Sequence, residues 1–548
     1  MPKVLIADEL SPRAAEILNA RGLAADVRPG LSPEDLRHAI AAYDGLAVRS
    51  ATKVTADLIA AAGALKVIGR AGIGVDNIDV AAATARGIVV MNTPYGNSIT
   101  AAEHTIALMF ALARQIPAAD RSTQAGRWEK SRFMGVELTG KTLGIIGCGN
   151  VGGIVAERAQ GLRMRVIAYD PFLSPERAVA LGVEKVELDE LYTRAEFVTL
   201  HTPLNEATRN LIDAAALARM KRGVRLVNCA RGGLVVEEDL ARALDSGQVA
   251  AAAIDVFAEE PARKNPLFGR DNVVATPHLG AATSEAQENV AVQIAGQMAD
   301  FLLSGAVAHA VNVPSLTAEE ARRLKPYMKL AEQLGSFAGQ RVESGVRVVA
   351  IEYEGAAAEL NVKPLTAILL AGLLSPQLAS VNMVNAPVLC RERHIRVSET
   401  LSPEPGDYQT LIRLTVTTSG SPRPFETPPG GGSSGVSRGA GEHSRRAVAG
   451  TLFGGDKPRL VAVEGIPLEA ELSGHVLFVR NSDKPGFIGA LGNTLGAAGV
   501  NIATFHLGRT APGQEAIALI EIDQALTPDT LDRVRGLPDV IQVKALQF

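Results

Sequence analysis

Three short stretches of the chain carry residue types that can move a proton and bind an anion. NCARGG contains Arg231, DVFAEEP contains Glu260, and TPHLG contains His278. A histidine with a pKa near neutrality can take the proton of a hydroxyl while a hydride leaves the same carbon, and a paired carboxylate raises that pKa and fixes the tautomer. An arginine can bind the substrate carboxylate and polarise its carbonyl. Singly, each residue would more often form a surface ion pair, but together at the ends of neighbouring strands they predict oxidation of a 2-hydroxy acid.

A glycine-rich turn supplies the site expected for the hydride acceptor. The segment LGIIGCGNVG places Gly147, Gly149 and Gly152 between an apolar strand and a helix that starts near Asn150 and Val151. These glycines permit a tight turn, the approach of a pyrophosphate to the backbone, and close packing of the helix on the strand. Free N–H groups at the helix N-terminus can then bind phosphate. The motif alone is equally typical of an ordinary glycine-rich turn, so its neighbours must decide.

The residue that decides the cofactor is Asp170. It ends a second apolar strand, 165–170, and follows Gly152 by 18 residues, where a carboxylate can accept hydrogen bonds from both ribose hydroxyls. Pro171 and Phe172 come next, so no arginine stands there for a 2′-phosphate. The sequence therefore predicts NAD rather than NADP.

The composition excludes several classes of function. A length of 548 residues predicts three or four domains, and 47% hydrophobic residues, 21% charged residues and a net charge of −4 describe a globular protein without the basic excess that nucleic acid requires. We expect small molecules and copies of the same chain as partners, with no nucleic acid and no membrane. Cys148, Cys229 and Cys390 lie too far apart for a metal-spaced pair or a disulfide framework, which predicts no metal site and a reducing compartment, the cytoplasm. Asp8 lies where a signal peptide needs its apolar region, so no signal peptide is expected. The apolar run at 365–374 is too short to span a bilayer.

Two parallel sheets are expected to position these residues. Alternating strands and Ala-rich helices open the chain, and the glycine-rich strand then starts a six-stranded doubly wound sheet. The helical run at 286–303 can return the chain to the opening lobe. We assign 1–98 and 286–314 to a substrate-binding domain and 99–285 to an NAD-binding domain. The expected strands are 3–7, 46–49, 66–70 and 88–91 in the first sheet, and 143–146, 165–170, 197–201, 224–228, 251–257 and 272–276 in the second.

The loops of the opening lobe are polar and suit an anionic substrate. They contain Arg49, Lys53, Arg70 and Asn97, although on location alone Arg49 and Arg70 could simply end strands in water. A long helix at 101–114 follows, and we interpret His104 within it as a packing or hydrogen-bonding residue and leave it out of the site.

The chain changes character after residue 314. Residues 315–465 contain helices and strands without a phosphate loop, which favours a structural or regulatory domain. Between strands 411–417 and 446–453, the segment 419–442 holds 16 Gly, Pro or Ser residues among 24 and is predicted to be a disordered insertion. The last part, 474–548, has the strand and helix pattern βαββαβ of a ferredoxin-like unit. Its expected elements are 475–480, 487–498, 501–508, 515–523, 528–537 and 540–546.

Residues 147–152, 228–233, 255–261 and 277–280 resemble the D-isomer-specific 2-hydroxyacid dehydrogenase family, with a match from Val4 to about Pro314. The resemblance implies His278 as acid and base, Glu260 as its partner and Arg231 as a substrate binder. It also implies that NAD is bound by Asp170, Thr202, Cys229, Asp255 and Gly280, in addition to the glycine-rich turn.

The loops at 48–53, 69–77 and 92–98 are similar to those of the family branch that oxidises 3-phosphoglycerate. This implies that Arg49, Lys53, Arg70 and Asn97 bind substrate, in the NAD-dependent oxidation of 3-phospho-D-glycerate to 3-phosphohydroxypyruvate, the first step of L-serine biosynthesis. One alternative is a dehydrogenase for glyoxylate, hydroxypyruvate, lactate or 2-oxoglutarate, which the cationic loops disfavour. Another is a non-catalytic NAD-sensing scaffold, which the intact Arg231, Glu260 and His278 disfavour.

The tail is similar to the long form of that branch, with an allosteric intervening domain and an ACT domain. The resemblance implies a homotetramer in which L-serine binds between two ACT domains at Asn481, Asp483 and Asn501. The insertion at 419–442 departs from the family pattern. The expected fold is therefore α/β: a Rossmann doubly wound nucleotide domain inserted in a flavodoxin-like substrate domain, followed by an α+β intervening domain and a βαββαβ ACT domain.

Overall fold

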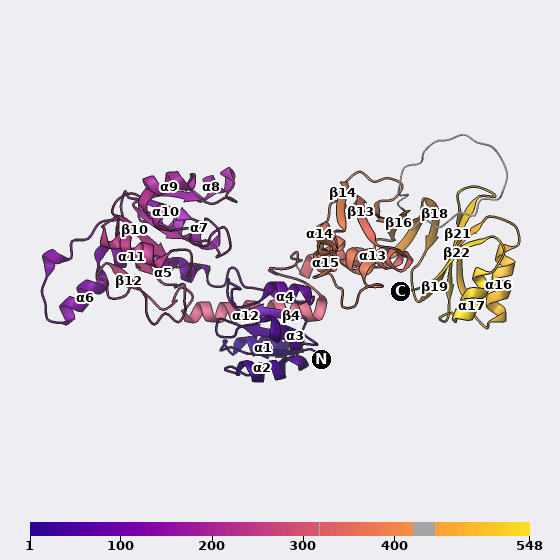
Figure 1. The fold of residues 1–548 in the computed structure, drawn as a ribbon, viewed down its shortest axis with the longest axis horizontal. Helices are drawn as coiled ribbons and strands as arrows, with labels where there is room; N and C mark the ends of the chain where they lie inside the picture. The colour runs from indigo at the N-terminus through magenta and orange to yellow at the C-terminus, as the bar shows by residue number, and fades with distance from the viewer. Residues whose placement is uncertain (317, 420–443) are drawn as a thin grey trace.

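The computed structural model describes residues 1–316, 318–419 and 444–548, which form four sheets in an elongated molecule (Figure 1). The sheet that contains β6 to β12 and the C-terminal sheet lie at opposite ends, and the N-terminal sheet lies between and below them. The insertion predicted at 419–442 lies outside the described residues from 420 onward. In the described part of the chain, no helix is both long enough and apolar enough to cross a membrane.

The N-terminal sheet is parallel, with the strand order β2-β1-β3-β4-β5. This is the flavodoxin-like order that we expected. One edge strand, β2, escaped prediction because it is short, partly exposed and not clearly apolar. Its strands are β1 (Lys3–Ile6), β2 (Ala24–Val27), β3 (Gly45–Val48), β4 (Val67–Arg70) and β5 (Val89–Met91), and its helices are α1 (Arg13–Ala20), α2 (Pro33–Ala39), α3 (Ala56–Ala61) and α4 (Val80–Ala85), with a 3₁₀ turn η1 (Ile40–Ala42).

The nucleotide sheet has seven strands in the order β12-β11-β10-β9-β6-β7-β8, so the prediction of six strands was wrong by one. The missed strand, β8, is two exposed charged residues long and carries no apolar signal. Read outward from β8, the order is that of a Rossmann sheet. Its strands are β6 (Thr142–Ile146), β7 (Arg165–Tyr169), β8 (Glu184–Lys185), β9 (Phe197–Leu200), β10 (Val224–Asn228), β11 (Val249–Ile254) and β12 (Val273–Ala275). Its helices are α5 (Ser98–Arg114), α6 (Ile116–Gln124), α7 (Asn150–Gly161), α8 (Pro175–Leu181), α9 (Leu188–Arg194), α10 (Ala214–Arg219) and α11 (Glu237–Asp245), with a 3₁₀ turn η2 (Lys130–Arg132).

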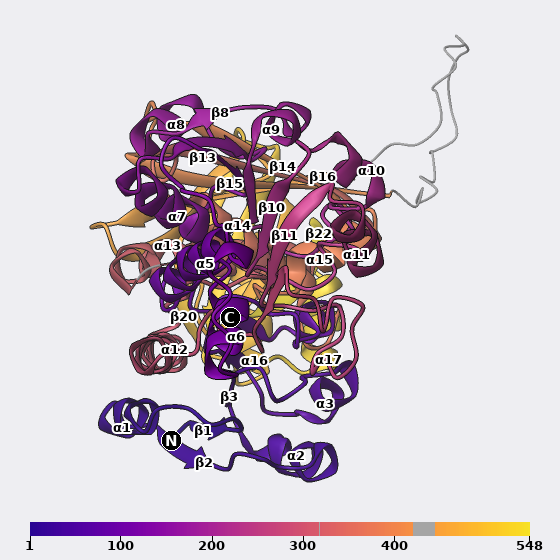
Figure 2. The same cartoon turned by 90° about the vertical axis from the view of Figure 1, so that its left-hand side faces the viewer.

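Helix α12 (Ser284–Ser304) returns the chain to the N-terminal lobe, as expected. Its Ile294 and Met298 are fully buried in one core with Val4. The approach is close at Gly69 in β4, where an added Cβ would lie 2.4 Å from Met298 Sδ. Figure 2 shows α12 end-on, directly above α1 of the N-terminal lobe.

The intervening domain contains the six-stranded sheet β14-β13-β15-β16-β17-β18. Helices α13 and α14 pack on each other, and α13 also contacts β15, β16 and β17. The elements are α13 (Ala318–Arg341), β13 (Val346–Gly355), α14 (Val362–Leu374), α15 (Ala386–Glu392), β14 (Arg396–Ser402), β15 (Thr410–Thr418), β16 (Ser444–Phe453), β17 (Lys457–Val463) and β18 (Ile466–Ala470).

The C-terminal domain has the predicted βαββαβ order, with an antiparallel sheet β20-β21-β19-β22. Its elements are β19 (His475–Ser482), α16 (Phe487–Ala497), β20 (Ile502–Arg509), β21 (Glu515–Ile522), α17 (Pro528–Arg535) and β22 (Val540–Gln547).

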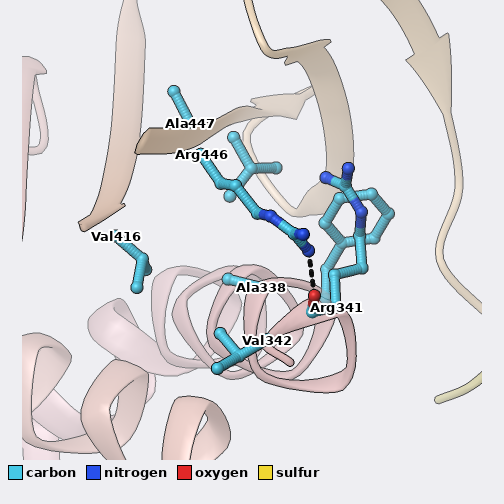
Figure 3. A pocket seen from close by; sticks show the side chains of 8 residues that line it. Ala338, Arg341, Val342, Val416, Arg446 and Ala447 are labelled. Carbon is cyan, nitrogen blue, oxygen red and sulfur yellow. Dashed lines mark hydrogen bonds between the residues drawn. The ribbon is translucent and has the colours of Figure 1, made fainter. Parts of the chain in front are cut away.

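A buried arginine joins the last two domains. Arg341 of α13 is 2% exposed, and its guanidinium lies 4.0 Å from the ring centroid of Phe478 in β19. Its Nη2 donates to Glu464 Oε1 at 2.6 Å, and Arg446 donates to the Arg341 carbonyl (Figure 3). Burial lowers the pKa of Arg341, while Glu464 opposes that shift. Phe337 of α13 lies in one buried cluster with Phe478 and Leu519, so the intervening and C-terminal domains share one core.

Candidate active site

The predicted acid–base pair forms at the ends of β11 and β12. His278 Nδ1 lies 2.7 Å from Glu260 Oε2, and Glu260 Oε1 accepts the Phe257 N–H at 3.0 Å. Burial by itself raises the pKa of Glu260, but the hydrogen bonds from His278 and Phe257 outweigh it and hold that pKa below its ordinary value. Glu260 is thus ionised near neutrality, and the network places the imidazole proton on Nδ1, which leaves Nε2 as the basic nitrogen.

Asp255 anchors the turn that carries His278. Its side chain is fully buried; Oδ1 accepts from the Thr276 hydroxyl at 2.6 Å and the Leu279 N–H at 2.8 Å, and Oδ2 accepts the Gly280 N–H at 2.9 Å. Its main-chain carbonyl accepts the His278 N–H at 2.8 Å. These bonds hold His278 in the left-handed region at φ 55°. Asp255, which the family resemblance implies as an NAD-binding residue, therefore also fixes the loop that carries His278.

The arginine from the nucleotide domain reaches the other lobe. Arg231 Nε donates to Asp76 Oδ2 at 2.8 Å. An added Cβ on Gly74 would lie 1.8 Å from Arg231 Nη2, so the guanidinium packs directly over a glycine. Burial, followed by repulsion from Arg231, lowers the pKa of Arg70 to about 10, and Arg49 contributes to the repulsion. Arg49, Arg70 and Arg231 thus come from two domains and repel one another, while Asp76 and Asp8 offset part of that repulsion.

The loop that carries Arg49 is fixed by a buried carboxylate. Asp8 accepts the Arg49 N–H at 2.6 Å and the Thr52 hydroxyl at 2.5 Å. Asn77 Nδ2 donates to the Arg49 carbonyl at 2.8 Å. Lys53, on the same loop, is exposed.

Asn97 stands at the N-cap of α5. Its Oδ1 is buried without a hydrogen-bond partner among the described residues. Because a buried unpaired oxygen is costly, this atom is suited to accept a bond from a ligand.

The glycine-rich turn has the geometry that a dinucleotide needs. Gly147 has φ 92°, and an added Cβ on Gly152 would lie 2.1 Å from the Gly147 carbonyl oxygen. Nothing lies within 4 Å of an added Cβ on Gly149, so this backbone is open to a ligand. Helix α7 starts at Asn150 and Val151, which places their N–H groups at its N-terminus.

The remaining expected cofactor residues surround the same turn. Asp170 Oδ2 accepts the Cys148 N–H at 2.9 Å, which fixes the carboxylate beside the glycines. Thr202 Oγ1 is buried and has no partner among the described residues. Burial raises the pKa of the Cys229 thiol to about 12, so Cys229 contributes packing rather than a thiolate. These residues fit an adenine dinucleotide.

Sequence reasoning missed three residues at the site. Asp8 and Asp76 fix Arg49 and Arg231, and His104 Nε2 lies 3.3 Å from Asp255 Oδ1. His104 does hydrogen-bond, as expected, but it lies at the site rather than away from it. His104 follows Asn97 by seven residues, which is about two helical turns and places both on one face. This spacing is the sequence signal that could have identified His104 as a site residue.

The residues implied for serine do not meet within one chain. Asn481 is 2% exposed, and its neighbour Asp483 accepts from Arg509 at 2.8 Å and from the Gly513 N–H at 3.1 Å. Asn501 instead donates to Asp523 at 2.8 Å. Strand β21 separates them, because Asn481 pairs with its first residues and Asn501 lies beside its end. A common site for all three requires a second copy of the domain.

Comparison with known proteins places the chain. It is 42% identical over 550 residues to a D-3-phosphoglycerate dehydrogenase of Synechocystis, and this match spans 99% of this chain and 95% of that protein. It is 40% identical over 550 residues to one of Methanocaldococcus jannaschii, which covers 100% of both. The chain belongs to the D-3-phosphoglycerate dehydrogenase family. A solved glyoxylate reductase from Paecilomyes thermophila is 30% identical, with a TM-score of 0.53 over 57% of this chain and 98% of that one.

The domains of this family member match separately. Residues 106–280 match the D-isomer specific 2-hydroxyacid dehydrogenase NAD binding domain, 323–426 the D-3-phosphoglycerate dehydrogenase intervening domain, and 475–539 the ACT domain. The family resemblance and the NAD cofactor inferred from the sequence are therefore confirmed. The chain is an NAD-dependent oxidoreductase.

Proposed function

We propose that this oxidoreductase converts 3-phospho-D-glycerate to 3-phosphohydroxypyruvate with NAD, the first step of L-serine biosynthesis, in the cytoplasm. The observation that carries the substrate is the gathering of Arg49, Arg70 and Arg231 at one place between two domains. Asp76 already pairs with Arg231, and a substrate with both a carboxylate and a phosphate offers these arginines more negative charge than glyoxylate or lactate, each of which offers a single carboxylate.

The residues have distinct roles in this proposal. Arg231 binds the substrate carboxylate, Arg49, Lys53 and Arg70 bind the phosphate end, and Asn97 offers a polar contact to the substrate. The turn of Gly147, Gly149 and Gly152, together with Asp170, would hold NAD, which would supply the hydride acceptor for C2.

Proton removal falls to the pair at the turn. His278 Nε2 takes the hydroxyl proton, and the Glu260 carboxylate stabilises the imidazolium that results. In the reverse direction the imidazolium returns the proton.

The test is a comparison of substrates. Initial rates of NADH formation should give a kcat/KM for 3-phosphoglycerate above that for glycerate, lactate and 2-hydroxyglutarate. Equal or higher values for an unphosphorylated acid would refute the substrate. No turnover with any 2-hydroxy acid, combined with tight NADH binding, would favour a scaffold.

We further propose a homotetramer in which L-serine binds between ACT domains. The placement of Asn481 and Asn501 at opposite ends of β21 supports a serine site shared by two copies. Serine should lower the rate of the full chain, and Asp483→Ala should abolish that response and keep the tetramer. Asp529→Ala, an exposed acid on α17, is the matched control. Serine binding to Asp483→Ala with unchanged affinity by calorimetry would refute the site.

A further inference from the structure

His104 links two elements of the site, although no step proposed above uses it. It lies on α5, two turns after Asn97, which is about 10 Å along the helix axis. Its Nε2 is 3.3 Å from Asp255 Oδ1 and 3.3 Å from Thr276 Oγ1, and its side chain is 19% exposed. It therefore joins helix α5 to the turn that carries His278.

The contact of His104 with Asp255 matters because Asp255 holds the turn that carries His278. Its carboxylate already fixes residues on both sides of His278 through Thr276, Leu279 and Gly280. Burial by itself raises the pKa of Asp255, but hydrogen bonds led by that from His104 hold it below its ordinary value. The carboxylate thus remains an acceptor for the whole turn, and His104 is the donor that reaches it from α5.

A metal site is the rival explanation of the same cluster. Ligand atoms of His104, Cys229 and Asp255 all lie within 4.8 Å of one another. However, both Asp255 oxygens accept bonds from the turn, and burial raises the pKa of the Cys229 thiol to about 12, which disfavours the thiolate that a metal needs. The cluster is suited to hydrogen bonding.

We propose that His104 is a positioning residue for the oxidation: its Nε2 group, held on helix α5, keeps in place the Asp255-anchored turn that carries His278. The proposal rests on the proposed function. A small displacement between a base and its substrate slows the chemical step, whereas the arginines that bind the substrate lie elsewhere and stay in place.

The experiment compares His104→Leu with His104→Gln. Leucine removes the donor, while the glutamine amide can place an N–H near the position of Nε2. We expect His104→Leu to lower kcat by about 10-fold with KM for 3-phosphoglycerate changed by less than about twofold, and His104→Gln to recover most of the loss. Glu103→Gln, an exposed neighbour on α5, is the control and should match the wild type.

Two outcomes would overturn the proposal. One is a wild-type kcat for His104→Leu. The other is an equal loss of kcat in both variants together with an equal fall in Tm, which would indicate packing alone. If the wild type oxidises another 2-hydroxy acid and not 3-phosphoglycerate, the proposed function fails, and the same comparison of variants is made with that acid.

Discussion

Replacing Glu260 by glutamine tests how the carboxylate controls the base. In the wild type, Glu260 Oε2 accepts from His278 Nδ1 at 2.7 Å while Oε1 accepts the Phe257 N–H at 3.0 Å. A glutamine that keeps its oxygen on the Phe257 N–H must turn its NH₂ group toward Nδ1. Nδ1 then becomes the acceptor and the ring proton moves to Nε2, which is the tautomer that cannot take the substrate proton.

The expected loss of kcat follows from the exposure of the His278–Glu260 pair and from the tautomer of His278. A hydrogen bond to a charged group contributes about 1.5–3 kcal/mol, and partial exposure of this pair places it near the lower value. The side chains of His278 and Glu260 are 48% and 36% exposed. Glu260→Ala, which leaves Nδ1 to water, should therefore lower kcat by about 10-fold. Glu260→Gln also loses the basic tautomer and should lower kcat by about 100-fold.

The assay is the initial rate of NADH formation at saturating NAD and substrate. Glu259→Gln, the exposed neighbouring acid, is the control. Because the pKa of Glu260 lies below its ordinary value, its carboxylate is lost only as the pH falls through that lowered value, so the order of the variants should hold across the neutral range. Glu260→Gln turning over as fast as Glu260→Ala would refute the tautomer argument.

Three further substitutions test the other parts of the site. His278→Ala should lower kcat by about 100-fold with NADH affinity retained, because general acid–base catalysis is worth about that much; near wild-type turnover would remove His278 from the role. Asp170→Ala should weaken NAD binding and narrow the preference over NADP, since the carboxylate accepts from ribose and repels a 2′-phosphate; titration of NADH and NADPH fluorescence checks this, and two unchanged affinities would contradict it. Gly152→Ala should abolish NADH binding and lower Tm, because the new Cβ would lie 2.1 Å from a backbone oxygen that cannot move freely; normal NADH affinity would show that α7 can shift away from the turn.

The structural features of the site that depend on spacing within a short stretch of chain were predicted correctly from the sequence. The glycine-rich turn and Asp170 are set by one strand, one turn and one helix, and the parallel order brings Arg231, Glu260 and His278 to one edge. Edge strands β2 and β8 carried no apolar pattern, so they were missed.

Contacts between distant segments could not be predicted from spacing. Arg231 and Asp76 are 155 residues apart, and Asp8 is 41 residues from Arg49. Each pair depends on how two lobes or two loops pack. The same limit applies to the ACT domain, where Asn481 and Asn501 belong to one sequence pattern but to opposite ends of β21.

Within the chain, the intervening domain lies between the ACT domain and the N-terminal lobe, and it contacts that lobe near the loop of Asp76. The ACT and intervening domains share the core around Arg341. The intervening domain touches the N-terminal lobe at the end of α4, where Asn382 donates to the Gly87 carbonyl at 2.9 Å and Asn385 to the Ala85 carbonyl at 3.3 Å. Helix α4 begins just after the loop that carries Asp76, the partner of Arg231. An effector that favours one position of the intervening domain can therefore alter how the two lobes hold the substrate without touching the NAD site, provided its affinity differs between the two positions.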